Sequence, residues 1–191
     1  MASDPTILAF DTSAAHCAAA LLSGDRLLAT HAEAMSRGQA ERLLPLLEEM
    51  LDRAGLGWRD LEAIGVGTGP GNFTGIRIAV SAARGLALGL AVPAYGIDGF
   101  AARRQALGTT GAVSVPAPRG QVYLSRPGAD PVLGPEAGDT TAGQPAPEAL
   151  AEAIARLAAP AWPQPAPAPA PLYIRPADAA PSADLPPVLL D

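Results

Sequence analysis

The sequence predicts an α/β domain in which a mixed β-sheet carries helices on its faces. Short apolar runs of strand length alternate with longer stretches of helical periodicity, as is typical of this class. Three strand-like runs come first, separated only by turn residues, and a glycine-rich loop later joins a buried strand to a helix. The 191 residues and 49% hydrophobic content are sufficient for the core that such a domain needs.

The N-terminal part of the chain predicts three consecutive strands. Residues 6–10 are apolar and are bounded by a proline and an aspartate. A polar turn leads into the apolar residues 17–22, and the Ser-Gly-Asp turn at 23–25 joins these in a hairpin to residues 26–34.

Helices and strands then alternate. Residues 36–55 carry apolar side chains at the period of an amphipathic helix, which Gly55 should end and which Pro45 should kink or begin as its first regular turn. The remaining predicted elements are a strand at 63–67, a helix at about 74–88, a strand at 92–97, a helix at 99–107 and a hairpin of strands at 111–115 and 121–125.

The predicted order is therefore β-β-β-α-β-α-β-α followed by a hairpin. It matches one lobe of the actin-like and ribonuclease-H-like proteins (the ASKHA fold). We assign residues 1–125 to this N-terminal lobe and residues 126–160, where helical periodicity is confined to 147–158, to an abbreviated second lobe. The proline-rich residues 161–171 predict an extended spacer, and residues 172–191 a C-terminal tail.

Composition restricts the classes of function. A net charge of −6 argues against a large basic surface that would hold nucleic acid by itself, so any RNA would be held mainly by another protein. Cys17 is the only cysteine, which excludes a disulfide framework and a thiolate metal cluster. The apolar run at 76–96 contains Arg77 and Arg84, and it predicts a buried helix rather than a membrane span. Because the start of the chain does not resemble a secretory leader, we expect a cytoplasmic protein without membrane association.

The glycine loop reads GTGPGNFTGIR at residues 67–77. Its place between a strand and a helix is that of a phosphate cradle, but it lacks the Lys-Ser/Thr of a P-loop and the spacing of a dinucleotide fold. We favour a tight turn in which the glycines adopt backbone angles closed to other residues and Thr74 caps the helix. Nucleotide contact remains the alternative, and its candidate residues are Asp11, Thr12, Ser13, Gly69, Pro70 and Gly71.

The helix after this loop has two different sides. Small residues, Ser81 and Gly85 among them, follow one side, whereas Ile76 and Val80 follow another. Small side chains let a second helix approach closely, so one side can serve the core and the other a partner protein. Arg77, in the first turn, opposes the positive end of the helix dipole, which predicts an acidic or carbonyl partner for it.

No pattern of residues predicts a metal site or a catalytic nucleophile. His16 and His31 are isolated and are interpreted as turn or surface residues. The G-x-S-x-G motif is absent, and no carboxylate pair has a spacing suited to hydrolysis. We therefore predict no catalytic residue, no metal and no required cofactor, with weak ATP or ADP binding left open.

Several strings resemble the TsaB family, also called YeaZ. They are ILAFDTSAAHCAAALL, RLLPLLEEML, GVGTGPGNFTGIRIAVSAARGLALGLAVPAYGI and RGQVYLS between residues 7 and 125, and PLYIRP near the C-terminus. The resemblance implies an accessory subunit of bacterial tRNA threonylcarbamoyladenosine synthesis. The catalytic paralogue, TsaD, has metal-binding histidines where this chain reads RGQAERLLPL and YGIDGFAA, so the resemblance implies a non-catalytic chain.

The resemblance also implies partners. The chain would pair with TsaD in a bundle of helices, help to recruit the ATPase TsaE, form a homodimer when alone, and meet tRNA only through the complex. The implied interface residues are Arg42, Leu43, Leu46, Ile76, Arg77, Val80, Ser81, Arg84 and Gly85.

Two departures from the family pattern stand out. Many members read D-A-R-x-G-E-V-Y where this chain has PAPRGQVY, which places Pro116, Pro118 and Gln121 at the Asp, Arg and Glu positions, and the second lobe is shortened. The alternative function is a degenerate actin-like nucleotide-binding phosphotransferase that uses Asp11 and the glycine loop. The glycoprotease label sometimes attached to the family has no supporting nucleophile or metal pattern here.

Overall fold

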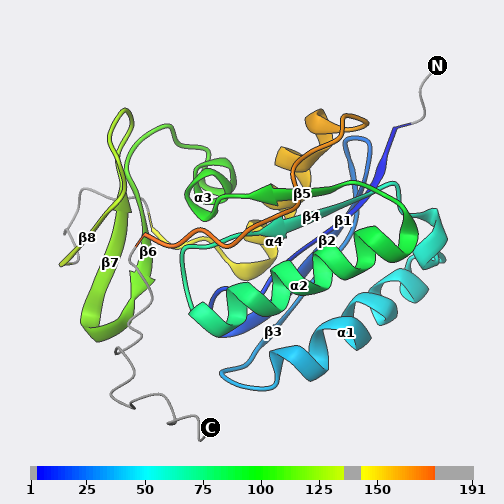
Figure 1. Cartoon of the computed structure of the whole chain (residues 1–191), viewed down its shortest axis with the longest axis horizontal. Helices are drawn as coiled ribbons and strands as arrows, with labels where there is room; N and C mark the ends of the chain where they lie inside the picture. The colour runs from blue at the N-terminus through cyan, green and yellow to red at the C-terminus, as the bar shows by residue number, and fades with distance from the viewer. Residues whose placement is uncertain (1–3, 136–142, 175–191) are drawn as a thin grey trace, which may run out of the picture.

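The computed structural model describes residues 4–135 and 143–174, and its main feature is a five-stranded sheet (Figure 1). The strand order is β3-β2-β1-β4-β5. These strands are β1 (Thr6–Asp11), β2 (His16–Ser23), β3 (Arg26–Ala34), β4 (Ala63–Gly67) and β5 (Ala94–Ile97). The first three strands pair antiparallel, whereas β1, β4 and β5 pair parallel. The predicted mixed sheet is therefore confirmed.

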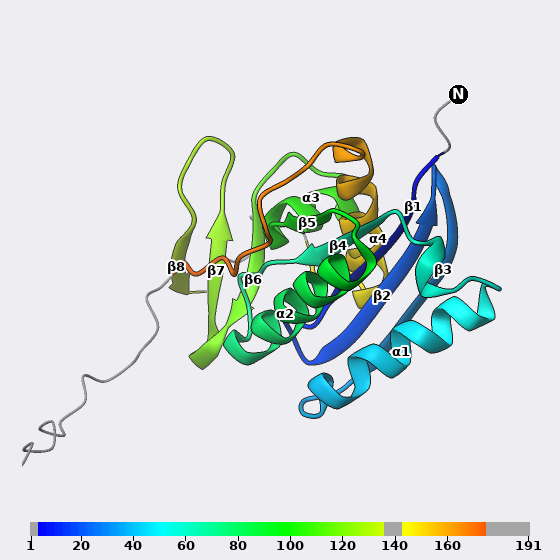
Figure 2. The ribbon, with the colours of Figure 1, turned by 45° about the vertical axis from the view of Figure 1, so that its right-hand side comes forward.

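Helices cover both faces of this sheet (Figures 1 and 2). The helices are α1 (Gln39–Arg53), α2 (Phe73–Leu90), α3 (Gly99–Leu107) and α4 (Pro147–Ala158), and short 3-10 turns occupy η1 (Trp58–Asp60), η2 (Pro118–Gly120) and η3 (Ala159–Ala161). α1 and α2 pack on one face and α4 packs on the other, with α3 against it. α1 continues through Pro45 to its end.

Strand β2 shows how the sequence produces this two-sided core. Because successive side chains in a strand point to opposite faces, Cys17, Ala19 and Leu21 pack with α1 and α2, whereas Ala18, Ala20 and Leu22 pack with α4. All six are buried. A strand buried on both faces reads as an unbroken apolar run, which is why CAAALL was recognisable as a strand.

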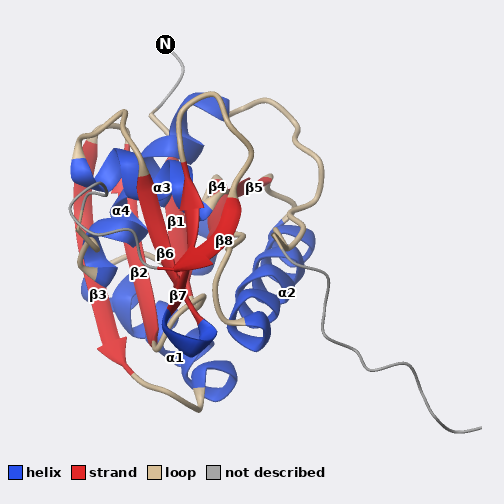
Figure 3. Ribbon diagram, turned by 90° about the vertical axis from the view of Figure 1, so that its left-hand side faces the viewer, coloured by secondary structure: helices blue, strands red, loops and turns tan. Residues whose placement is uncertain are grey.

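A second, three-stranded sheet lies beside the first (Figure 1) and faces the viewer in Figure 3. It consists of β6 (Val113–Ala117), β7 (Gln121–Ser125) and β8 (Val132–Pro135), all antiparallel. The predicted lobe boundary is therefore wrong in two respects. The hairpin of β6 and β7 leaves the first sheet to pair with β8, which the sequence did not predict, and α4 belongs to the core of the first lobe.

The proline-rich segment docks against the domain. We call residues 163–174 the C-terminal strap. The Tyr95 hydroxyl donates to the Gln164 carbonyl at 2.8 Å, and the Leu172 amide donates to the Thr68 carbonyl at 2.8 Å. Pro169, between them, is buried. The predicted extended spacer is thus held beside β5 and the loop that follows β4. Residues 175–191 of the predicted tail lie outside the described residues.

Candidate functional site on the outer face of helices α1 and α2

Asp11, at the end of β1, is the centre of a buried polar cluster. Its Oδ1 accepts hydrogen bonds from the Ser13 amide at 3.0 Å, the Ser13 hydroxyl at 2.8 Å and His16 Nε2 at 2.9 Å. Burial disfavours the charged carboxylate, but the hydrogen bond and charge of His16 and the two bonds from Ser13 outweigh it and lower the pKa of Asp11. The Ser13 hydroxyl donates to the aspartate, so it is not placed for activation by the histidine.

The glycine loop packs directly on this cluster. A Cβ on Gly67 would overlap the Asp11 carboxylate, and one on Gly75 would overlap the Thr12 carbonyl oxygen. The Thr12 hydroxyl donates to the Gly75 carbonyl at 2.7 Å. The helix cap is Asn72, whose side-chain oxygen accepts from the Gly75 amide at 2.9 Å, and this corrects the prediction of a Thr74 cap.

The six candidate nucleotide contacts are brought together but are largely enclosed. Asp11, Thr12 and Ser13 are each at most 4% exposed, and Gly69 and Pro70 are buried as well. Gly69 has a φ of 92°, and a Cβ on Gly71 would meet the Ser13 carbonyl, as expected of a tight turn. In this arrangement the loop fixes the start of α2 against β1.

The candidate interaction surface lies over α1 and α2, where exposed apolar residues border a pocket. A shallow pocket of about 620 Å³ separates the two helices. Its lining residues are Leu44, Pro45, Glu48, Trp58, Gly85, Leu86, Gly89 and Leu90. We call this pocket the helix groove. Leu44 on its wall is 46% exposed, and Leu88 on the same helix as the two glycines is 86% exposed.

The two glycines of the helix groove have open space beside them. A Cβ on Gly85 or Gly89 would have no neighbour within 4 Å among the described residues. Unlike the loop glycines, they are therefore not required by packing against residues 4–135 or 143–174. They lower the helix propensity of α2, and no contact within that part of the chain compensates for it.

The structure divides the predicted interface residues. Arg77, Ser81, Arg84 and Gly85 lie exposed on the outer side of α2.

Other predicted interface residues are corrected because they belong to the core. Leu43, Leu46 and Ile76 are each 1% exposed and are not available to a partner. Val80 is 3% exposed, although it lines a second pocket. The residues on the accessible side of α1 are instead Leu44, Pro45 and Glu48.

Arg42, also predicted at the interface, is engaged within the chain. It donates two hydrogen bonds to Glu33 on β3, at 2.6 and 2.8 Å, and two to Glu49, at 2.6 and 2.9 Å. The hydrogen bonds from Arg42 lower the pKa of Glu33 to about 2. Arg42 thus ties α1 to the sheet edge.

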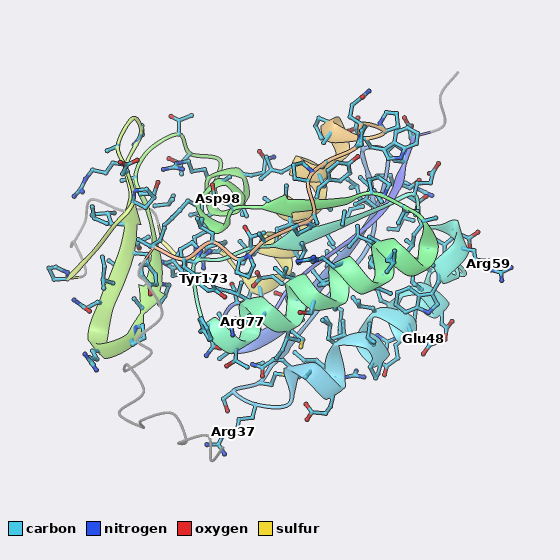
Figure 4. The ribbon with its side chains drawn as sticks, in the orientation of Figure 1. Arg37, Glu48, Arg59, Arg77, Asp98 and Tyr173 are labelled. Atoms are coloured by element: carbon cyan, nitrogen blue, oxygen red, sulfur yellow. The ribbon has the colours of Figure 1, made fainter. Side chains whose placement is uncertain are left out.

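Arg77 has aromatic partners instead of the predicted acid or carbonyl. Its guanidinium lies over the Phe73 ring, 3.8 Å from the centroid, and its Nε donates to the Tyr173 hydroxyl at 2.9 Å. The rings of Phe73 and Tyr173 stack with centroids 5.2 Å apart. Figure 4 shows Arg77 and Tyr173 beside each other at the start of α2. The C-terminal strap thereby becomes part of the outer face.

Sequence reasoning missed the structural roles of His16 and Arg103. His16 is 8% exposed, and a surface position for it is wrong. The only feature of the sequence that could have indicated its contact with Asp11 was its position across a turn from that residue. Arg103 is 5% exposed, and its guanidinium donates to the Gly99 carbonyl at 3.1 Å and to the Gln144 side chain at 3.3 Å. Burial lowers the pKa of Arg103, and no local pattern distinguished it.

Two general properties bear on the site. Within residues 4–135 and 143–174, no three His, Cys, Asp or Glu side chains are grouped as metal ligands would be.

α2 is long and apolar enough by composition to cross a membrane, but it packs on the sheet through Ala79 and Ala83 and carries Arg77 and Arg84 on its outer side.

Comparisons with known proteins identify the family. The family model described as "TsaD: tRNA N6-adenosine threonylcarbamoyltransferase" matches residues 30–158. The TsaB protein of Haemophilus influenzae is 41% identical over 103 residues, which is 53% of this chain and 42% of that protein. TsaB of Escherichia coli is 39% identical over 92 residues, 48% of this chain and 39% of that protein. The chain thus matches less than half the length of these curated relatives.

Solved structures agree with the sequence relatives. A Pseudomonas aeruginosa protein described as similar to peptidase YEAZ is 28% identical, has a TM-score of 0.73, and is matched over 90% of this chain and 100% of its own. YeaZ from Pseudomonas aeruginosa is 26% identical, with a TM-score of 0.70 and coverage of 89% and 100%. The chain belongs to the TsaB/YeaZ family, within the group that the TsaD model describes, and the predicted actin-like fold is confirmed.

Proposed function

We propose that this chain is a non-catalytic scaffold subunit in the synthesis of threonylcarbamoyladenosine on tRNA, which pairs through the helix groove with a TsaD-type transferase. The observation that carries the proposal is the groove itself, an exposed apolar depression between two helices with two glycines on its wall. Large exposed apolar patches mark interaction sites, and glycines on a helix surface let a second helix approach closely.

The names of the relatives support the choice of partner in this proposal. TsaB proteins are named for tRNA threonylcarbamoyladenosine biosynthesis, and the matched family model is named for the threonylcarbamoyltransferase. A transferase with the same fold carries equivalent helices, so pairing of the two outer faces makes a four-helix bundle. In this proposal the chain forms a homodimer when alone, helps to recruit the ATPase TsaE, works in the cytoplasm and meets tRNA only through the complex.

The proposal assigns neither cofactor nor reaction to this chain. The Asp11 carboxylate accepts three hydrogen bonds from its own neighbours, and the loop glycines pack against residues Thr12 and Ser13. These contacts favour a structural role for the strand ends over the phosphotransferase alternative. The same cluster gives no support to peptidase chemistry, because Ser13 donates to Asp11.

The test measures complex formation by size exclusion with light scattering. The full-length chain is run alone and then mixed with the TsaD-type transferase of the same organism. A one-to-one species that forms at the expense of any homodimer is expected. Two proteins that elute independently would contradict the proposal.

Matched variants test the groove. Leu44→Glu places a charge on the groove wall, and Val132→Glu makes the same change on β8, where the side chain is 49% exposed against 46% for Leu44. We expect Leu44→Glu to weaken the complex at least about tenfold, equivalent to about 1.4 kcal/mol, and Val132→Glu to leave it unchanged. Equal effects of the two variants would remove the groove from the interface.

A further inference from the structure

Two arginines on the outer side of α2 lack the acidic partner that three arginines of α1 and α4 have. Arg42, Arg53 and Arg156 pair with glutamates of this chain. Arg77 and Arg84 form no ion pair with any described residue, although the chain has a net charge of −6.

The two arginines share one pocket. A depression of about 430 Å³ is lined by Arg77, Val80, Ser81, Arg84 and Pro171. Seven residues of helix separate the arginines by about 10.5 Å along the axis, which is two turns. Both arginines therefore border the same depression, together with Val80 and Ser81 of α2, and Pro171 of the C-terminal strap completes its wall.

Arg77 is held in position before any partner arrives. Its guanidinium is stacked on Phe73 and its Nε donates to the Tyr173 hydroxyl, while its two terminal nitrogens donate no hydrogen bond to any described residue. The aromatic side chains are themselves 39% and 40% exposed. An arginine ordered in advance loses less conformational entropy on binding, and its planar fork suits a carboxylate.

The rest of the outer face has the opposite charge. The exposed residues of α1 include Glu41, Glu48 and Asp52, and Figure 4 shows Glu48 toward the end of α1 far from Arg77. The face is thus acidic on α1 and basic on α2, with the apolar helix groove between. A complementary partner must be basic opposite α1 and acidic opposite α2.

We infer that Arg77 and Arg84 form an anion-binding half of the docking face, which receives a carboxylate-bearing segment of the partner protein, with Tyr173 as the positioning residue for Arg77. The inference rests on the proposed function and names the chemistry by which the partner is recognised. An RNA phosphate backbone is the less suitable occupant, because two arginines supply few phosphate contacts and the acidic row on α1 repels a polyanion.

The test is calorimetric titration of the full-length chain with the TsaD-type transferase. Arg84→Glu should weaken binding at least about tenfold, as expected when a desolvated charge pair becomes a repulsion. Arg26→Glu is the matched control, because Arg26 is exposed at the β2–β3 hairpin. This hairpin lies at the beginning of β1, where Ser23 pairs with Thr6, whereas α2 starts at the other end of β1. The wild-type affinity should also fall more steeply with salt than that of Arg77→Gln.

A double-mutant cycle tests the positioning role. Tyr173→Phe keeps the ring stack and removes the bond to Arg77, so it should weaken binding about threefold in the wild type and have no effect beside Arg77→Gln. Equal binding of wild type, Arg84→Glu and Arg77→Gln would overturn the inference while the proposed function stands. A loss of tRNA binding by the isolated chain in these variants, with transferase binding unchanged, would also overturn it. If the wild type does not bind the transferase, both proposals fail.

Discussion

Replacement of Gly85 by alanine should stabilise the folded chain and weaken its complex. The position lies inside α2, where glycine costs about 0.8–1.0 kcal/mol relative to alanine in helix propensity. No described residue lies within 4 Å of the Cβ that the substitution adds, so no steric cost from residues 4–135 or 143–174 offsets this gain. Gly89→Ala meets the same conditions.

The expected change in stability follows from the gain in helix propensity and the lack of a steric cost. Each variant should raise the free energy of unfolding by about 0.8–1.0 kcal/mol and the melting temperature by about 2–4 °C for a chain of this size. The added methyl groups stand on the wall of the helix groove, where a partner helix would approach. We expect the dissociation constant of the complex to rise, and to rise further for Gly85→Leu.

The assay pairs urea unfolding, followed by circular dichroism at a concentration where light scattering shows the monomer, with calorimetric titration of the transferase. The opposite signs of the two effects are the diagnostic result. A lower stability for Gly85→Ala would show that the groove is filled in the free protein. An unchanged dissociation constant for Gly85→Leu would show that the partner does not approach these glycines.

Two further predictions concern stability. Gly67→Ala forces a methyl group onto the Asp11 carboxylate and should lower the free energy of unfolding in urea by about 1–3 kcal/mol; a loss below about 0.5 kcal/mol would contradict the close packing of the loop. The pKa of Glu33 falls from 4.5 to about 2 through its hydrogen bonds from Arg42, so its contribution is complete above pH 4.5 and disappears as the pH falls toward 2. Glu33→Gln should flatten the loss of stability in that window, and a curve parallel to that of the wild type would refute the assignment.

The elements of the fold were largely predictable because their patterns are local. Unbroken apolar runs identified the strands, and helical periodicity identified α4 to the residue. β8 was missed because four residues that include a glycine and a proline carry no strand pattern. The position of α4 on the first sheet was missed because it depends on contacts between residues far apart in the sequence.

The candidate site was predicted less well, for a related reason. Periodicity shows that α1 and α2 have apolar sides, but it does not say which side meets the sheet. Leu43 and Leu46 were therefore predicted at the interface although they are buried in the core, whereas Leu44, the residue after Leu43, lies on the groove wall. Nor does a local pattern show that Tyr173, far along the chain, lies against Arg77.

The loop glycines and the glycines on the outer side of α2 lie in opposite environments, and this difference relates the loop to the proposed docking face. At Gly67 and Gly75 the chain's own atoms occupy the space that a side chain would need, whereas no described residue lies within 4 Å of a Cβ added at Gly85 or Gly89. The first group, with the Asn72 cap, fixes the start of α2 on β1, so the direction in which α2 presents its outer side is set by the buried cluster. In the proposed complex, a strand-end loop that resembles a phosphate cradle would thus serve recognition between proteins, because it fixes the helix that carries the proposed contact residues.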